Sequence, residues 1–441
     1  MPLPESPPPL ARLLTSMSPE RLLTLPAVAD DTRYLHWDEL RHRPVPDGVS
    51  LEEWWLSLRL RRSGNQRPLP FLDRDQHPFV FGLNDAVAQY LHQIDLALGG
   101  RLTGPDRLAT GEMRDRYLVS SLIEEAITSS QMEGASTTRR IASTMLRTGR
   151  APVTKSERMI LNNYHVMEFI RSQASEALTP EMVLEVQRIL VAGTLEDERD
   201  AGRLQVASET RVSVRDNRDD SVLHAPPEAN ELPRRLALLC DFANGKAAYS
   251  GFLHPIVRAI LLHFMLAYDH PFVDGNGRTA RALFYWSLLN QGYQLAEFLS
   301  ISRVLKNAQG QYKRAFLHTE TDAGDTTYFV LHQLQTIKRA VDELHGYLAT
   351  KQREIETVER QMRGGRQLNH RQRALLAHAM RHPGFIYTIE SHRASHGVAF
   401  ATARADLLQL RELRLLDEAA KIGRALAFLA PGNLAERLAQ V

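Results

Sequence analysis

The sequence predicts a mainly α-helical protein with one β-hairpin near its middle and a small winged helix-turn-helix domain at its C-terminal end. Three observations predict this fold class. Apolar residues recur with helical spacing along most of the chain. Only one stretch before the C-terminal region alternates as a pair of strands does. The pair Gly364-Gly365 interrupts a long helical pattern and separates residues 366–441 from the rest.

Length and composition limit the class of protein. The chain has 441 residues, enough for two or three domains, and 43% hydrophobic and 24% charged residues, as in soluble globular proteins. A net charge of +2 excludes a nucleic-acid polycation. The single Cys240 excludes an internal disulfide and favours a reducing compartment. No signal peptide is recognisable, and the longest apolar run, residues 256–267, is too short to span a bilayer. We therefore expect a cytoplasmic protein without membrane association.

Residues 1–70 predict an N-terminal extension that packs on the main body of the protein. Three of the four tryptophans, Trp37, Trp54 and Trp55, fall in this part. Aromatic side chains near a terminus commonly anchor the segment to a core, with a ligand-stacking site as the alternative. We therefore expect the tryptophans to hold the extension in place.

Residues 71–150 predict a helical region that leads to one isolated acid. The expected helices and the glycines that end them are Phe79–Leu98 with Gly99-Gly100, and Arg114–Ser130 with Gly134. Glu133 follows the second helix, where a carboxylate is electrostatically unfavourable. Glu133 therefore needs a partner or a purpose, although composition alone predicts an exposed acid on a loop.

Residues 151–363 predict the core of the molecule. Its expected helices and strands are, in order, Glu157–Arg171, Pro180–Val191, the strands Thr210–Val214 and Ser221–His224, then Pro255–Tyr268, Ala280–Leu288, Ser302–Leu317 and Thr326–Met362. Thr179-Pro180 supplies an N-cap and a proline at the first helical position. Gly292 supplies a stop after the helix that contains Leu288.

The stretch between two of these helices, residues 270–281, concentrates the polar chemistry of the chain. A tight loop delivers Gly275, Asn276 and Gly277 to the start of the second helix. The unpaired N–H groups and the positive dipole end of a first turn bind anions, and glycines let a phosphate approach the backbone. The loop therefore predicts an anion site.

Four side chains add to this anion site. Arg278 and Arg281 project from the first turns of the second helix, and guanidinium groups match phosphate oxygens. Asp274 places one carboxylate beside the site, which suits a hydrated Mg²⁺ that also takes substrate phosphates. His270 can accept a proton near neutral pH. Together they predict a site for phosphoryl or nucleotidyl transfer.

Three other interpretations of residues 270–281 fit the sequence less well. The spacing Gly275-x-Gly277-x-x-Ala280 also fits a dinucleotide-binding fingerprint, but that motif must follow a strand, and here it follows a helical pattern. The chain has no P-loop motif. A plain turn between helices explains the glycines, but it does not explain why His270 and two arginines converge on the same loop.

The stretch as a whole, residues 270–281, resembles the signature of Fic-domain proteins. That signature reads His-Pro-Phe-x-[Asp/Glu]-Gly-Asn-Gly-Arg-x-x-Arg, and every fixed position is met here. The resemblance covers the chain from about residue 70 onward, and this motif is its most specific part. It implies a Fic-type helical bundle and transfer of AMP from ATP to a hydroxyl group of a protein.

The resemblance also implies a role for each residue of the motif. His270 would be the general base for the target hydroxyl, and Asp274 would hold Mg²⁺. The nucleotide would be bound by Asn276, by the amides of Gly275 and Gly277, and by Arg278 and Arg281 at its β- and γ-phosphates.

Upstream of this signature, Ser129-x-x-x-Glu133-Gly134 resembles the inhibitory motif of the same family, [Ser/Thr]-x-x-x-Glu-[Gly/Asn]. Met132 stands where the common form has isoleucine. The resemblance implies that Glu133 pairs with Arg281 and removes the ligand of the γ-phosphate. ATP would then bind with its α-phosphate misplaced for in-line attack.

The hairpin, near residues 210–226, resembles the Fic flap, which docks a target protein by strand pairing beside the catalytic histidine. Its sequence does not allow contacts to be assigned residue by residue. A hairpin without this function is the alternative.

Residues 366–441 predict the winged helix-turn-helix domain. Its expected parts are the helices Arg371–Arg381, one starting at Thr388, and Ala399–Leu413, followed by a wing around Gly423. Arg393, Arg404 and Arg411 could meet DNA phosphates, but acidic residues lie among them. DNA binding and protein docking are both left open.

The leading hypothesis is an autoinhibited, Mg²⁺-dependent adenylyltransferase that uses ATP and modifies a target protein or itself. Alternatives within the class are removal of AMP by the same site, with Glu133 positioning water, and the use of another nucleotide. A different class is a DNA-binding regulator whose Fic part senses a nucleotide. The identity of the target and the oligomeric state, including a homo-oligomer, are left open.

Overall fold

The computed structural model describes residues 3–25, 31, 33–98, 112–216, 219–364, 368–382, 384–422 and 425–438. They form two compact units. Within the described residues, the first unit contains the chain up to Leu98 together with Val119–Val341, and the second contains residues 112–118 and the chain from Asp342 onward.

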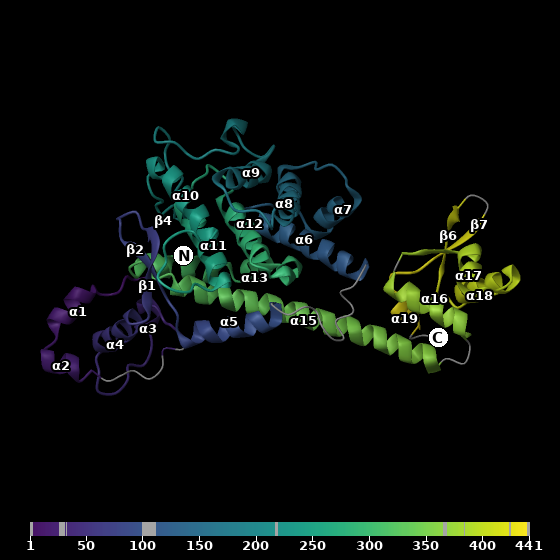
Figure 1. Cartoon of the computed structure of the whole chain (residues 1–441), viewed down its shortest axis with the longest axis horizontal. Helices are drawn as coiled ribbons and strands as arrows, with labels where there is room; N and C mark the ends of the chain where they lie inside the picture. Colours follow the sequence, from purple (N-terminus) through teal and green to yellow (C-terminus); the bar gives the residue numbers. More distant parts are fainter. Residues whose placement is uncertain are drawn as a thin grey trace. The chain divides into compact units, whose positions relative to one another are not determined.

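The first unit is mainly helical, as predicted (Figure 1). Its helices are α1 (Leu10–Ser16), α2 (Pro19–Leu23), α3 (Trp37–Leu40), α4 (Leu51–Ser63), α5 (Asp85–Leu98), α6 (Glu112–Met132), α7 (Arg139–Thr148), α8 (Lys155–Ser172), α9 (Pro180–Val191), α10 (Leu232–Ala243), α11 (Pro255–Asp269), α12 (Asn276–Asn290), α13 (Ile301–Asn307), α14 (Gln309–Thr321) and α15 (Thr327–Gly364). Its strands are β1 (Gln66–Leu72), β2 (Pro78–Gly82), β3 (Val214–Arg215) and β4 (Val222–His224). Helices α6 and α15 each extend into the second unit.

Helices α11 and α12 form the centre of the core. Most residues of both helices are buried; α11 is largely apolar, whereas the first turns of α12 also bury polar side chains, including Arg278 and Arg281. His254 caps α11 through its ring Nδ1, which accepts from the Ile256 amide at 3.3 Å, and Pro255 occupies the first helical position. Helices α8 and α9 pack on α12, and α10 packs on α11. The loop between the two central helices is therefore held by a rigid frame.

The predicted helix from Phe79 to Leu98 is wrong in its first part. Helix α5 begins at Asp85, and Phe79 belongs to β2, which pairs antiparallel with β1. Phe79 and Phe81 are 1% and 3% exposed and are separated by the less buried Val80, as expected for side chains on one face of a strand. The Asn84 side chain accepts from the Val87 amide at 2.9 Å and starts the helix there. The predicted stop at Gly99-Gly100 lies outside the described residues.

Two further predicted elements differ from the structure. The expected helix from Ser302 to Leu317 is two helices, α13 and α14, separated by Ala308 with φ −131° and ψ 39°. The flap hairpin is shorter than predicted, because residues 210–213 are outside β3. Strands β3 and β4 pair antiparallel over only a few residues.

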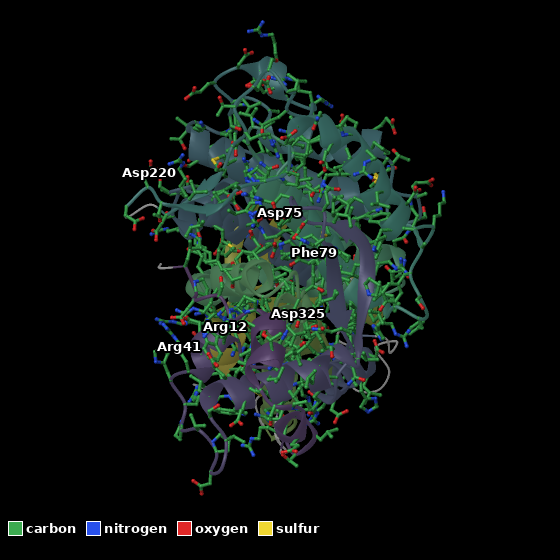
Figure 2. The ribbon with its side chains drawn as sticks, turned by 90° about the vertical axis from the view of Figure 1, so that its left-hand side faces the viewer. Arg12, Arg41, Asp75, Phe79, Asp220 and Asp325 are labelled. Carbon is green, nitrogen blue, oxygen red and sulfur yellow. The ribbon has the colours of Figure 1, made fainter. Side chains whose placement is uncertain are left out.

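The N-terminal extension is tied to the start of α15. Trp37 and Trp55 are buried and pack edge to face, with ring centroids 5.9 Å apart. The Arg62 guanidinium lies 3.9 Å from the centre of the Tyr34 ring. The Tyr34 hydroxyl donates to Asp325, labelled in Figure 2, at 2.6 Å. The two tryptophans thus pack within the extension, and Tyr34 makes the contact with the main body; the anchoring role expected for the tryptophans stays a prediction.

The second unit has its own sheet and core. Its further helices and strands are α16 (His370–Arg381), β5 (Ile386–Thr388), α17 (Ile389–His396), α18 (Phe400–Glu412), β6 (Asp417–Ile422), β7 (Ala425–Leu429) and α19 (Leu434–Leu438). The antiparallel sheet has the order β5-β7-β6, and Leu376, Leu407 and Phe428 lie in the core beside it. Gly365 and Gly423 lie outside the described residues, and the assignment to the winged-helix fold stays a prediction.

Among the helices of the described ranges, none is both long enough and apolar enough to cross a lipid bilayer.

Candidate active site

Two residues with positive φ shape the loop between α11 and α12. His270 ends α11 with φ 44° and ψ 54°, and its amide donates to the Leu266 carbonyl at 3.0 Å. A left-handed conformation is uncommon for a residue with a side chain. Gly275 precedes α12 with φ 89°, and a Cβ on it would come within 3.0 Å of Val191 Cγ1. Glycine is therefore required there for its conformation and for lack of space.

Asn276 closes this loop from within. Its side-chain oxygen accepts from the Phe272 amide at 2.9 Å, and its side-chain nitrogen donates to the Phe272 carbonyl at 2.8 Å. The same nitrogen lies 3.3 Å from Nδ1 of His270. Asn276 is 3% exposed, so its side chain fixes the loop and the histidine ring.

Arg211 and Gln205 hold the loop from outside. The Arg211 guanidinium donates to the carbonyls of Asp269 and His270 at 2.7 Å and 3.2 Å. The backbone amide of Gln205 donates to the Pro271 carbonyl at 2.9 Å. These carbonyls follow the end of α11 and have no partner within the helix, so the donors satisfy them. Neither residue could be assigned a role from the sequence; the signal for Arg211 is a cation in the first arm of the predicted hairpin.

The surroundings of His270 favour its neutral form. Burial lowers the pKa of its ring to about 4, together with the positive charges of His224 and Arg211, against the opposing effects of Glu133 and of a backbone hydrogen bond with Val212. A neutral ring has a free lone pair at neutral pH. Such a ring can accept a proton from a bound hydroxyl group.

The N-terminus of α12 meets the carboxylate of Glu133. A Cβ on Gly277 would collide with Oε1 of Glu133 and would lie 3.1 Å from Nη1 of Arg281. The carboxylate therefore lies directly against the first turn of α12. An anion is favoured at this end of a helix, so Glu133 occupies a place where a phosphate group would also be stabilised.

Arg281 joins this carboxylate to α6. Its Nη2 donates to Glu133 Oε1 at 2.9 Å and to the Ser129 carbonyl at 3.0 Å, and its Nε donates to the Ser129 hydroxyl at 2.9 Å. Arg281 is 4% exposed, whereas the Glu133 side chain is 33% exposed. Gly134 has φ 93° and follows the end of α6. The structure thus brings Ser129 and Glu133 together with an arginine that is distant in sequence.

Arg278 lies in a different environment from Arg281. Its side chain is fully buried and donates to the Leu190 carbonyl and to Asp274 Oδ2, each at 3.1 Å. Asp274 is 46% exposed at its side chain, and its Oδ1 accepts from the Gly275 amide at 2.6 Å. Arg278 therefore orients the carboxylate of Asp274. A phosphate contact by Arg278 stays a prediction.

Asp274 can serve as a ligand for a divalent cation. Its carboxylate is accessible and stands beside the anion-binding turn of α12. Within the described ranges, no group of three or more His, Cys, Asp or Glu side chains is arranged to hold a metal ion. A single carboxylate fits an ion such as Mg²⁺ that takes one or two protein carboxylates and completes its coordination with phosphates and water.

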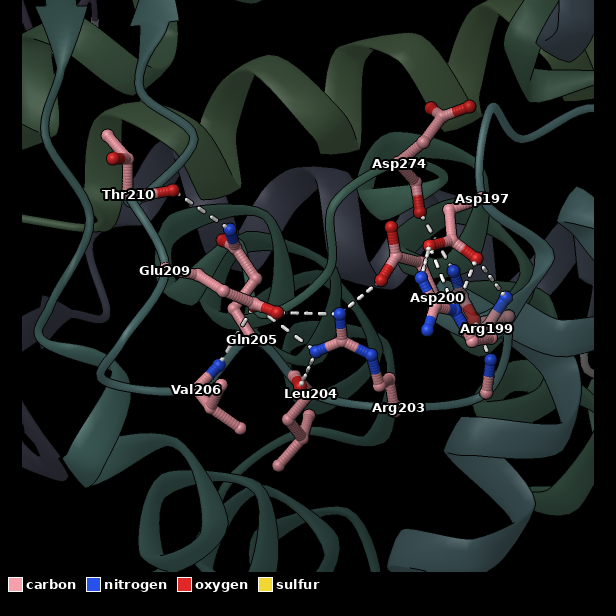
Figure 3. A network of polar contacts seen from close by, with 12 residues as sticks. Asp197, Arg199, Asp200, Arg203, Leu204, Gln205, Val206, Glu209, Thr210 and Asp274 are labelled. Atoms are coloured by element: carbon pink, nitrogen blue, oxygen red, sulfur yellow. Dashed lines mark hydrogen bonds and ion pairs between the residues drawn. The ribbon is translucent and has the colours of Figure 1, made fainter.

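A polar groove lies beside the loop, between it and the first arm of the flap (Figure 3). Arg203 pairs there with Asp200 and with Glu209, the latter at 2.6 Å. The cavity has a volume of about 610 Å³ and is lined by Asp197, Arg199, Asp200, Arg203, Gln205, Glu209, Thr210, Val212 and Val273. Val273 belongs to the loop itself, so the groove leads to the site.

Comparison with known families decides what this loop belongs to. Residues 177–288 match the family model of the Fic/DOC family. The chain contains a Fic/DOC domain. The matched residues include most of α9 to α12 and therefore the whole loop from His270 to Arg281. Ser129 and Glu133 lie N-terminal to the matched segment and reach the Fic domain only through folding.

Curated relatives and a solved structure agree with this domain. The protein adenylyltransferase Fic of Nematostella vectensis is 31% identical over 180 residues, which are 40% of this chain and 36% of that protein. The protein adenylyltransferase Fic of Drosophila willistoni is 41% identical over 70 residues, 16% of this chain and 14% of that protein. The matches therefore span about a third or less of these relatives.

A Fic family protein from Desulfovibrio desulfuricans G20 shares the fold, with a TM-score of 0.54 at 20% identity, over 79% of this chain and 96% of that one.

Proposed function

We propose that this protein is a Mg²⁺-dependent adenylyltransferase that transfers AMP from ATP to a hydroxyl group of a target protein and is restrained by Glu133. The observation that carries the proposal is that His270, held by Asn276, lies in the same loop as the first turn of α12. A base and an anion site in one loop are the two requirements for moving a nucleotide to a hydroxyl group.

In the proposed reaction, the target hydroxyl gives its proton to His270 while its oxygen attacks the α-phosphorus of ATP. A new bond forms between that oxygen and phosphorus, and the bond from the α-phosphorus to the bridging oxygen breaks. Pyrophosphate leaves with the electron pair. The amides at the start of α12 and the Arg281 guanidinium hold the β- and γ-phosphates. Mg²⁺ bound at Asp274 would neutralise phosphate charge.

The proposed restraint follows from the position of Glu133. Its carboxylate binds the guanidinium of Arg281 at 2.9 Å and lies against Gly277. A γ-phosphate would need the same arginine and the same helix end. Like charges repel, so a triphosphate would be displaced from the in-line geometry that attack at the α-phosphorus requires.

The proposed target is a protein that docks on the flap near residues 210–226, or the protein itself. An extended peptide can add its backbone to the short strands there. The polar groove beside the flap offers Glu209 and Arg203 to flanking side chains of such a peptide. The cytoplasm is the compartment that we propose, on the single cysteine of the chain.

Removal of AMP is the second candidate function, because the Glu133 carboxylate is one-third exposed at the site and could orient a water molecule. A DNA-binding regulator is less well supported. In the second unit Arg393 lies beside Glu390, and Arg411 lies beside Glu418, so acidic groups that repel phosphate stand next to both arginines.

Labelled ATP tests the proposed reaction. The Glu133→Gly protein is incubated with a cell lysate and with ATP labelled either at the α- or at the γ-phosphate. We expect a protein band that is labelled only by α-labelled ATP. We expect no label when the enzyme carries His270→Ala together with Glu133→Gly. Label from the γ-phosphate, or label that survives His270→Ala, would contradict the proposal. A gel shift with genomic DNA fragments, done in parallel, tests the regulator alternative.

A further inference from the structure

His224, at the end of the flap strand β4, bridges the flap and the end of α11. Its Nδ1 lies 2.7 Å from Glu320 Oε2, and its Nε2 lies 2.7 Å from the Tyr268 carbonyl oxygen. The ring also packs against the Tyr268 ring, with centroids 4.8 Å apart. His224 is 7% exposed, so these contacts are shielded from water. From the sequence alone, His224 is recognisable only as part of a predicted strand.

The two partners of the His224 ring define its charge. A carbonyl oxygen only accepts hydrogen bonds, and so does an ionised carboxylate. Both ring nitrogens must therefore carry a proton, which makes the ring an imidazolium. A neutral ring would turn one buried lone pair toward a buried oxygen and lose a charge-assisted hydrogen bond. The pairing with Glu320 accordingly raises the pKa of His224 despite its burial.

This imidazolium lies at the end of the helix that carries His270. Tyr268 is in the last turn of α11, where the carbonyls lack partners and where a cation is favoured. His224 binds the Tyr268 carbonyl, Arg211 binds the next two carbonyls, and the Gln205 backbone amide binds the Pro271 carbonyl. Residues 205–224, which include the flap strands, thus bind every carbonyl from Tyr268 to Pro271. The flap and the loop of His270 are thus one connected structure.

Several charged groups surround the two histidines. His224 faces Glu320 of α14 and Asp269 of α11. Asp269 is itself paired with Arg235 of α10, at 2.7 Å. The groups that act on His270 are the cations His224 and Arg211 and, with the opposite sign, the carboxylate of Glu133. Removing the charge of His224 therefore removes one of two cations that oppose protonation of His270.

We infer that His224 is a positioning residue of the site: as an imidazolium it fastens the flap to the end of α11 and places a positive charge at the helix end that leads to His270. The inference rests on the proposed function only for its effect on catalysis. Its effect on the proton affinity of His270 is a property of the folded protein, and it can be measured whether or not AMP is transferred.

A role of His224 as a hydrogen-bonded link alone predicts a different pKa of His270 in a variant without the charge. Glutamine at position 224 can still donate a hydrogen bond to the Tyr268 carbonyl, but it carries no charge. If His224 were only a tie, the pKa of His270 would be the same in His224→Gln as in the wild type. If the charge matters, His270 becomes easier to protonate and its pKa rises, by about one unit for the loss of a nearby cation.

The test is an NMR titration of the full-length protein with labelled histidine. The His270 and His224 signals are assigned from their loss in His270→Ala and His224→Gln. Ring nitrogen shifts then show whether His224 is an imidazolium at neutral pH. The matched control is His254→Gln, which removes a histidine that pairs with Asp95, at 2.9 Å, at the other end of α11.

We expect an imidazolium signal for His224 and a raised pKa of His270 in His224→Gln but not in His254→Gln. A neutral His224 in the wild type, or an unchanged pKa of His270 in His224→Gln, would overturn the inference. If His224→Gln does not melt cooperatively, Glu320→Gln replaces it, because losing that carboxylate weakens the imidazolium. Where the His224 signal shows a neutral ring in Glu320→Gln, the pKa of His270 must rise; where that ring stays charged, the pKa of His270 must not rise. Either opposite result overturns the inference.

The rate of AMP transfer separates the two proposals. If both hold, the acid limb of the pH profile moves upward together with the pKa of His270. A raised pKa in a protein that transfers no AMP, even with Glu133→Gly, would contradict the proposed function and leave the role of His224 intact.

Discussion

At the scale of single residues, the proton affinity of His270 sets the pH range of the proposed reaction. Its pKa is lowered to about 4, and the base acts only when it is deprotonated. The rate should therefore be flat from neutral pH downward and fall below about pH 5, with its midpoint near the pKa. The measurement is kcat/KM against pH for Glu133→Gly. A midpoint near 6.5, the ordinary value for histidine, would contradict the assignment.

The same pKa affects folding. The pKa of the His270 ring is lower in the folded than in the unfolded chain. Folding is therefore most favourable at a pH above the pKa of the unfolded chain, where the ring is neutral in both states. This contribution is lost as the pH falls from about 6.5 toward 4.

Gly277 and Glu133 provide a test that needs no activity. A Cβ on Gly277 meets the carboxylate of Glu133, whereas the helix itself favours alanine over glycine by about 1 kcal/mol. Gly277→Ala should therefore raise the free energy of unfolding less in the wild type than in Glu133→Gly, or lower it only in the wild type. The measurement is denaturant unfolding of the four proteins, with an expected interaction energy of about 0.5–3 kcal/mol. Additive effects would show that the carboxylate does not lie against the helix.

At the scale of elements, the position of α6 decides whether Glu133 reaches the site. Glu125 and Ser129 are four residues apart on one face of this helix, and Glu133 directly follows its last residue, Met132. The buried carboxylate of Glu125 accepts a hydrogen bond from the Ser300 hydroxyl at 3.1 Å. It also accepts two hydrogen bonds from Ser302, at the start of α13: one from the backbone amide at 3.0 Å and one from the hydroxyl group. Glu125 therefore fastens α6 to α13 about two turns before Glu133.

Glu125→Ala should loosen this attachment. We expect a loss of about 2–4 kcal/mol in the free energy of unfolding, because buried donors on α13 lose their acceptor. We also expect faster AMP transfer, because α6 holds Glu133 less firmly. The matched control is Glu124→Ala, which breaks only an ion pair with Arg139, a side chain that is 72% exposed. Equal stability and equal transfer in the two variants would refute the role of Glu125.

The elements also show which parts of the fold the sequence could predict. The loop from His270 to Arg281 was readable because all its groups are adjacent in sequence. The hairpin of β1 and β2 was not, because Pro68 and Pro70 obscure a strand that lies at an edge. The roles of Arg211 and His224 were not readable either, because each is defined by a carbonyl group that only folding brings near.

At the scale of the whole molecule, the described residues divide into two units, and every predicted site residue lies in the first. The second unit has a separate core that includes Leu376, Leu407 and Phe428. A chain that ends at Arg363 should therefore melt cooperatively and keep its AMP transfer within about threefold, since no group of the site is removed. The control is the same shortened chain with His270→Ala. A folded but inactive shortened chain would show that residues 366–441 contribute to the chemistry.

The central claim is that Glu133 restrains the protein by occupying Arg281 and the first turn of α12. Its most direct test is the initial rate of AMP incorporation at saturating ATP for the wild type, Glu133→Gly, Arg281→Ala and the double variant. We predict that Glu133→Gly is faster than the wild type, with the gain mainly in kcat, and that the gain largely disappears in the Arg281→Ala background. A Glu133→Gly protein no faster than the wild type, or a gain that persists without Arg281, would contradict the claim and favour a water-positioning role for Glu133 in AMP removal.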